Sequence, residues 1–217
     1  ALNPNHPREM GSAQNPDIFF QSREACNSFY DELPAIVQEN MDKVNSKIGT
    51  DYKLFNYYGA KDATKVIIAM GSVCETIDET IDYLVAKGEK VGLVKVRLYR
   101  PFSKEALIAA IPDSAQQLYV LDRTKEPGSI GEPLYLDVRA LFYGMENAPM
   151  IIGGRYGLSS KDVPPSNIVA IFDHLTSENP MNGFTVGIND DVTFKSIPVG
   201  ENLVVTKSDV RECLFYG

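Results

Sequence analysis

Four short apolar runs, each followed by a segment with helical periodicity, most strongly constrain what this chain can fold into. The apolar runs lie at 65–71 (KVIIAMG), 90–99 (KVGLVKVRLY), 116–122 (QQLYVLD) and 149–154 (PMIIGG). The helical patterns follow them at 72–88, 103–112, 131–144 and 164–175. Buried strands that alternate with helices are typical of a mainly parallel sheet covered on both faces. We therefore predict an α/β domain over 61–178, with a mainly parallel open sheet and helices on both faces.

A lead-in precedes this domain at 1–60. Its first 21 residues are rich in Pro and Asn and lack periodicity, which indicates an extended segment. An amphipathic pattern then runs from Ser22, the expected N-cap, to a close at Gly49. Pro34 is expected to break or kink that helix, so two helices are possible. An aromatic run at 53–59 indicates a strand or extended segment.

The sequence pattern changes at residues 179–217, which contain three strand-like runs (GFTVGI, VTFKSI and RECLFYG) and no helical pattern between them. They predict a strand-rich extension towards a neighbouring domain. The chain starts at Ala1 without an initiator Met and stops on the glycine that closes the last run. We therefore expect a piece of a longer polypeptide.

Composition narrows the classes of partner. The 217 residues carry a net charge of −8, which disfavours nucleic acid and acidic lipid surfaces as partners. The longest apolar runs fall far short of the roughly 20 residues that span a bilayer. No charged-then-apolar leader opens the chain, so we expect a cytoplasmic protein with no membrane partner.

Cysteine and histidine usage gives no sign of a metal centre. Three widely separated cysteines without a CxxC pattern predict reduced, mostly buried thiols and no metal or cluster site. The two histidines form no ligand pattern, and we expect His174 to be a solvated residue at a helix end.

Cationic residues follow three of the predicted strands, at the edge where open parallel sheets bind ligands. Arg100 lies in RLYRPFS and Arg155 in GGRYG. Either residue could meet an anion, or form a salt bridge on this acidic surface. GSxxE at 71–75 presents a helix start that could bind an anion, but a tight turn with Ser72 as N-cap explains it equally simply, and we favour the turn.

The loop DRTKEPGSIGEP at 122–133 joins a strand to a helix and carries Arg123, Lys125, Gly128 and Gly131. It could cradle a phosphate or form a structural corner in contact with another domain. Glu132 in the first helical turn already suits the helix dipole and would repel a phosphate. The near-balanced charges favour a domain contact, with the two glycines giving the backbone freedom to turn.

Five stretches resemble pyruvate:ferredoxin (flavodoxin) oxidoreductases, in the order expected for that family. They are GSAQNPDIFFQSREACNSFY (11–30), YKLFNYYGAKDA (52–63), VGLVKVRLYRPFS (91–103), DRTKEPGSIGEPLYLDV (122–138) and FTVGINDDVT (184–193). The resemblance covers essentially the whole chain. It implies the second domain of a multidomain enzyme, similar to the C-terminal domain of transketolases.

The resemblance implies a parent that converts pyruvate and coenzyme A to acetyl-CoA and CO₂, and passes electrons to ferredoxin or flavodoxin. The parent would use thiamine diphosphate, Mg²⁺ and [4Fe–4S] clusters, take coenzyme A as substrate and form a homodimer. No residue here matches the family's cofactor, cluster or pyruvate ligands, so we expect no cofactor, no catalytic residue and no metal in this segment. Its expected partners are the other domains of the same chain.

Two alternatives stay open. One is an anion- or nucleotide-binding regulatory module in which Arg100, Arg123 and Arg155 converge on one cleft. The other is the equivalent domain of an oxidoreductase for a different 2-oxoacid.

Overall fold

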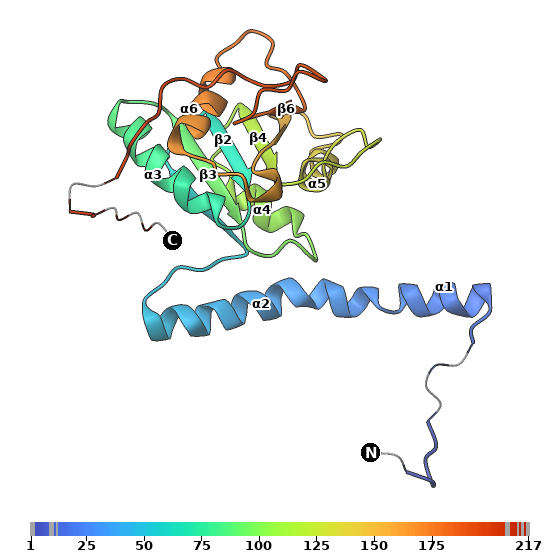
Figure 1. Ribbon diagram of the computed structural model, residues 1–217. Coiled ribbons are helices and arrows are strands. Elements are labelled where there is room, and N and C mark those ends of the chain that lie inside the picture. The colour runs from blue at the N-terminus through green and yellow to red at the C-terminus, as the bar shows by residue number, and fades with distance from the viewer. Residues whose placement is uncertain are drawn as a thin grey trace.

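A six-stranded sheet in the order β1-β3-β2-β4-β5-β6 forms the centre of the computed structural model, which describes residues 3–8, 11, 13–206, 209–211, 213 and 215. The strands are β1 (Phe55–Gly59), β2 (Lys65–Ala69), β3 (Val91–Val96), β4 (Gln117–Asp122), β5 (Met150–Arg155) and β6 (Phe184–Thr185). β1 runs antiparallel to β3, and every other neighbouring pair is parallel. The predicted open, mainly parallel sheet is confirmed (Figure 1).

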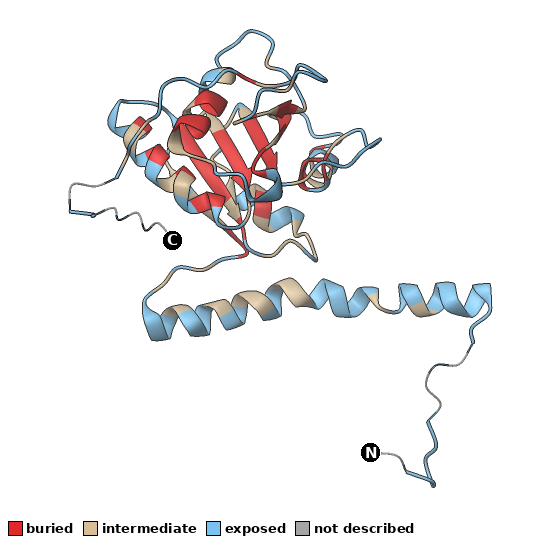
Figure 2. Ribbon diagram, in the orientation of Figure 1, coloured by how far each residue is buried: buried red, intermediate tan, exposed pale blue. Residues whose placement is uncertain are grey.

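Helices cover both faces of the sheet, as the apolar strands require. Successive side chains of a strand point to opposite faces. In β2, Ile67 and Ala69 pack with residues of α3 (Val73–Ala86) and α6 (Pro165–His174). Val66 and Ile68 pack on the other side with α4 (Lys104–Ala110) and α5 (Pro133–Leu141). The buried strands between these two layers are visible in Figure 2.

The lead-in forms a long helical arm of α1 (Pro16–Glu24) and α2 (Asn27–Ile48), drawn below the sheet domain in Figure 1. The expected helix start at Ser22 is wrong. Asn15 caps α1 by accepting a hydrogen bond from the Ile18 amide at 3.0 Å, and Pro16 occupies the first helical position. The extended segment predicted for 1–21 is therefore helical from Pro16 onwards.

Pro34 lies inside the continuous helix α2, so of the expected break or kink the break does not occur. A proline removes one backbone hydrogen bond, and tertiary contacts further along α2 compensate. Val37 and Met41 pack against the core, and the Gln38 side chain accepts a hydrogen bond from the Leu54 amide at 3.1 Å. The predicted close of the helix at Gly49 is confirmed by its φ of 72°.

The segment after α6 contains less strand than predicted. GFTVGI contributes only the two-residue strand β6, and VTFKSI only an isolated bridge between Thr185 and Ser196. The third run, RECLFYG, lies largely outside the described residues. The boundaries at 60 and 178 stay a prediction, although β1 and β6 extend the sheet beyond both of them.

Candidate functional site

The sheet has one point where its strand order reverses. From β2 the chain proceeds to β3 on one side, and it later continues to β4 and β5 on the other side. Such a switch point leaves a crevice at the carboxyl ends of the two central strands, where open α/β sheets usually bind ligands. A pocket of about 360 Å³ lies there, lined by Met70, Gly71, Ser72, Tyr99, Leu121, Asp122, Arg123, Thr124, Pro133 and Tyr156.

The turn from β2 into α3 forms one wall of this switch-point pocket. Gly71 has a φ of 81°, which fits the tight turn that we predicted. Ser72 occupies the N-cap position of α3 as predicted, but its backbone is helical and its hydroxyl makes no capping bond. The amides of Cys74 and Glu75 bond back to Gly71 and Ser72, at 3.1 and 3.2 Å. Within the described residues, the amides of Ser72 and Val73 have no acceptor.

Arg123 and Tyr156 enter the pocket from the ends of the neighbouring strands. The Arg123 Nε donates to the Gly157 carbonyl at 2.8 Å, which fixes the guanidinium across the end of β5. Tyr156 is only 4% exposed, and its backbone amide is held by the Asp122 carbonyl at 3.2 Å. Burial raises the pKa of its phenol to about 12, so the hydroxyl keeps its proton at neutral pH.

Asp122 closes the site on the side of α5. Its carboxylate accepts hydrogen bonds from the amides of Leu134 at 2.9 Å and Tyr135 at 3.0 Å. These amides belong to the first turn of α5, so an internal carboxylate already occupies the place where a phosphate would bind. Burial raises the pKa of Asp122 and outweighs the lowering effect of the two amides.

The rest of the 122–133 loop is tied together around Glu132. This side chain is buried and accepts a hydrogen bond from the Glu126 amide at 2.7 Å. Its Oε1 also lies 3.9 Å from the Lys125 Nζ and 3.9 Å from a terminal nitrogen of Arg155. Lys125 and Arg155 therefore face Glu132 rather than an open anion site.

The two glycines of the loop serve different purposes. Gly128 has a φ of 80° and provides the backbone freedom that the sequence predicts. Gly131 has an ordinary φ, but a Cβ there would lie 2.5 Å from the Tyr135 ring. At Gly131 the requirement is close approach to α5, so the predicted need for backbone freedom is wrong at that position.

The three strand-end arginines do not share one pocket. Arg100 donates to the Asp137 carboxylate at 2.7 Å and lies 4.0 Å from the centre of the Tyr99 ring. Arg155 donates to the Gly183 carbonyl at 2.5 Å and faces Glu132. Of the three, only Arg123 lines the switch-point pocket.

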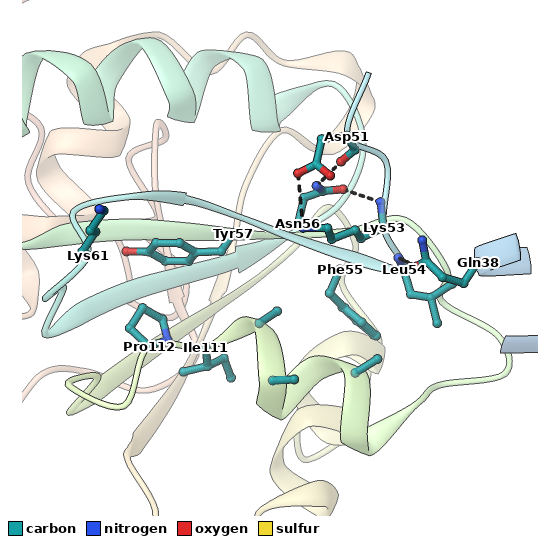
Figure 3. Close-up of a pocket in the computed structure, with 13 residues that line it drawn as sticks. Gln38, Asp51, Lys53, Leu54, Phe55, Asn56, Tyr57, Lys61, Ile111 and Pro112 are labelled. Atoms are coloured by element: carbon teal, nitrogen blue, oxygen red, sulfur yellow. Dashed lines mark hydrogen bonds and ion pairs between the residues drawn. The ribbon is translucent and has the colours of Figure 1, made fainter. Parts of the chain in front are cut away.

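A larger pocket of about 600 Å³ lies between β1 and α4, beside the arm (Figure 3). Its polar side chains bond mostly to neighbouring backbone and side chains. Asn56 donates to the Asp51 carbonyl at 2.5 Å, Lys53 lies 3.3 Å from the Asp51 carboxylate, and Gln38 is held by Leu54. No His, Cys, Ser or Thr is among the residues that line this pocket, so its size alone does not indicate a reaction.

Cys74 and His174 have structural surroundings rather than those of a reactive site. Burial raises the pKa of the Cys74 thiol to about 11, which makes it a poor nucleophile. His174 is half-buried rather than solvated: it accepts a hydrogen bond from the Met181 amide at 2.8 Å and stacks on Tyr119, which corrects our expectation. Across the described ranges, no three His, Cys, Asp or Glu side chains form a group that could hold a metal ion.

Comparison with known proteins shows what this fold is similar to. The family model described as "Pyruvate:ferredoxin oxidoreductase core domain II" matches residues 63–168, which run from just before β2 into α6. A pyruvate-flavodoxin oxidoreductase of Enterobacter agglomerans is 57% identical over the whole chain. The chain belongs to the pyruvate:ferredoxin (flavodoxin) oxidoreductase family. The pyruvate:ferredoxin oxidoreductase of Moorella thermoacetica is 52% identical, again over the whole chain.

The chain matches only a small part of the length of these relatives. It spans 19% of the Enterobacter protein and 18% of the Moorella protein. Among solved structures, a Magnetococcus marinus 2-oxoglutarate:ferredoxin oxidoreductase with 2-oxoglutarate, coenzyme A and succinyl-CoA bound aligns with 66% of this chain and 23% of its own. The identity is 19% and the TM-score 0.44, a likeness too loose to carry an argument. In the part of the chain that the structure describes, no helix is both long and apolar enough to cross a membrane.

Proposed function

We propose that this chain is a non-catalytic interface domain of its parent oxidoreductase. The parent converts pyruvate and coenzyme A to acetyl-CoA and CO₂, and passes two electrons to ferredoxin or flavodoxin. Thiamine diphosphate, Mg²⁺ and the [4Fe–4S] clusters belong to other domains of the parent, and coenzyme A is its substrate. The names of the two relatives, and the high identity over the whole chain, support this parent reaction.

The helical arm is the observation that carries the interface role. Neither α1 nor α2 contains a buried residue (Figure 2). Large apolar side chains nevertheless lie along both helices: Phe19, Phe20 and Phe29 are 56%, 68% and 73% exposed. A helix with an apolar face gains its stability mostly by packing that face against a partner. Large apolar side chains exposed in this number on one element are typical of an interaction site.

The proposed partner of the arm is the rest of the parent polypeptide. More than four-fifths of the length of each relative lies outside the region that matches this chain. The parent domains are therefore available at high effective concentration to cover the apolar face. The internally bonded 122–133 loop, with its exposed tip at Ile130, provides a second contact surface.

The experiment places Phe19→Asp together with Phe29→Asp in the full-length parent and in the isolated 217-residue chain. In the parent we expect a clear fall in melting temperature and a loss of activity, because each change removes an apolar contact worth about 1.5–3 kcal/mol. In the isolated chain both side chains are already exposed, so its unfolding free energy should change by no more than about 0.5 kcal/mol per site.

A matched control is Gln21→Asp together with Ser46→Asp, which adds the same charge at exposed polar positions of the same helices. The control should leave the parent unchanged. If both double variants lowered the melting temperature and activity equally, the added charge and not the loss of apolar contacts would be the cause. A calorimetric titration in which coenzyme A bound the isolated chain with micromolar affinity would contradict the non-catalytic role.

A further inference from the structure

The switch-point pocket contains hydrogen-bond donors that the interface role leaves unused. We propose that this pocket binds a small oxyanion, either a phosphate or a carboxylate group. It would be held by the start of α3, the hydroxyls of Ser72 and Tyr156, and the guanidinium of Arg123. This site is separate from the interface that the arm provides.

The start of α3 supplies two free donors and a favourable field. The amides of Ser72 and Val73 have no acceptor in the described structure, and α3 continues for 14 residues behind them. The first amides of a helix carry partial positive charge and bind anions well. Ser72 also leaves its own hydroxyl unused, because it makes no capping bond.

Tyr156 is the independent observation that points to a ligand. Tyr156 is only 4% exposed, yet its hydroxyl has no hydrogen-bond partner among the described residues. The sealed, unpaired side-chain atoms in those residues are Asp78 Oδ1, Tyr119 OH and Arg155 Nε. The Tyr156 hydroxyl is not one of them, so it is accessible, and Tyr156 itself lines the switch-point pocket. This hydroxyl is therefore available to donate a hydrogen bond to a ligand in the pocket.

The charge around the pocket suits an anion. Arg123 forms no ion pair within the described residues. Its side-chain hydrogen bond goes to the neutral Gly157 carbonyl, so its positive charge is not neutralised by a carboxylate. Asp122 is the one carboxylate among the lining residues, and both of its oxygens accept from the amides of α5. An adjoining hollow shares Gly71 and Ser72 and is lined by two cations, Lys95 and Arg97, and by one carboxylate, Glu75.

The test is a titration of the ¹⁵N-labelled 217-residue chain with inorganic phosphate, with sodium chloride added to keep the ionic strength constant. We expect saturable shifts of the Ser72 and Val73 amide resonances, with a Kd in the millimolar range. Arg123→Gln and Tyr156→Phe should each raise that Kd about tenfold, because each removes a hydrogen bond to a charged group. Phe keeps the buried ring, so Tyr156→Phe separates ligand binding from folding.

Arg100→Gln is the matched control, since Arg100 lies at the same sheet edge but pairs with Asp137 outside the pocket. Its Kd for phosphate should stay within about twofold of the unsubstituted chain. A parallel titration with acetate distinguishes the two anions: saturation of the same amides by acetate alone would assign the pocket to a carboxylate. The proposal would be overturned if neither anion saturated these amides. It would also be overturned if Arg100→Gln weakened phosphate binding as much as Arg123→Gln does. We expect Phe19→Asp and Phe29→Asp to leave the phosphate titration unchanged. The interface role of the arm and the anion site can therefore be refuted separately.

Discussion

Asp122 shows how one side chain decides what a loop can do. Two amides of the first turn of α5 donate to its carboxylate, and the adjoining Leu134 side chain is fully buried. The same amides would be the binding groups of a phosphate loop. The protein therefore supplies its own anion, which turns a phosphate-like sequence into a corner between strand and helix.

Asp122→Ala should destabilise the chain by about 1–3 kcal/mol, because it leaves two amides at a buried helix start without an acceptor. The measurement is the free energy of unfolding in urea at neutral pH. Asp113→Ala removes an exposed carboxylate for which no bond is recorded in the described structure, and it should change that free energy by less than about 0.5 kcal/mol. Equal effects of the two changes would show that the bonds to α5 contribute nothing.

Asp190 is the residue where pH should act on local structure. Its carboxylate accepts hydrogen bonds from the Thr193 hydroxyl and from the amides of Val192 at 3.0 Å and Thr193 at 2.9 Å. These bonds hold its pKa well below the usual value of 3.8. A depressed pKa means that the bonds are fully present above the unfolded-state value and are lost as the pH falls through the folded-state value.

The Thr193 amide resonance should therefore stay constant from neutral pH down to about pH 4, and shift only in more acidic solution. An NMR titration measures the midpoint directly. Asp190→Asn, which cannot ionise, should abolish the shift. A midpoint at or above 3.8 in the unsubstituted chain would contradict the hydrogen-bonded turn.

At the scale of elements, local pattern predicted the sheet and its covering helices because the central strands consist mostly of apolar residues. Val66 and Ile67 face different layers and are both fully buried, so no other arrangement suits that strand. The helix boundaries were less predictable. Asn15 and Pro16 formed a recognisable helix start that the Pro-rich lead-in obscured, and Pro34 was tolerated because contacts distant in sequence hold α2.

The candidate site was only partly visible in the sequence. Arg123 could be located at a strand end, because the run before it is apolar and the fold class fixes the ligand-binding edge. The burial of Tyr156 and the pairing of Arg155 with Glu132 depend on how segments distant in sequence pack together. Ser72 has the sequence of an N-cap, and only its backbone conformation shows that its hydroxyl is free.

The whole molecule divides into a well-packed sheet domain and an arm whose apolar side chains are exposed. The carboxyl half of α2 is fixed to the domain through Gln38 and through Asn45, whose Oδ1 accepts from the Tyr52 amide at 2.8 Å. The arm is therefore presented in a set direction, as a contact surface between domains requires. This arrangement also makes a prediction for the chain when it is separated from its parent.

The isolated chain should associate weakly with itself through the arm, because no parent domain then covers Phe19 and Phe29. The free energy gained by burying a few such side chains only modestly exceeds the entropic cost of association. We therefore expect a dissociation constant on the order of 10⁻⁴ M. Light scattering should show a mass that rises with concentration. The Phe19→Asp and Phe29→Asp pair should restore the monomer mass, while Gln21→Asp with Ser46→Asp should not. A constant monomer mass at millimolar concentration would mean that the arm's apolar face is not adhesive by itself.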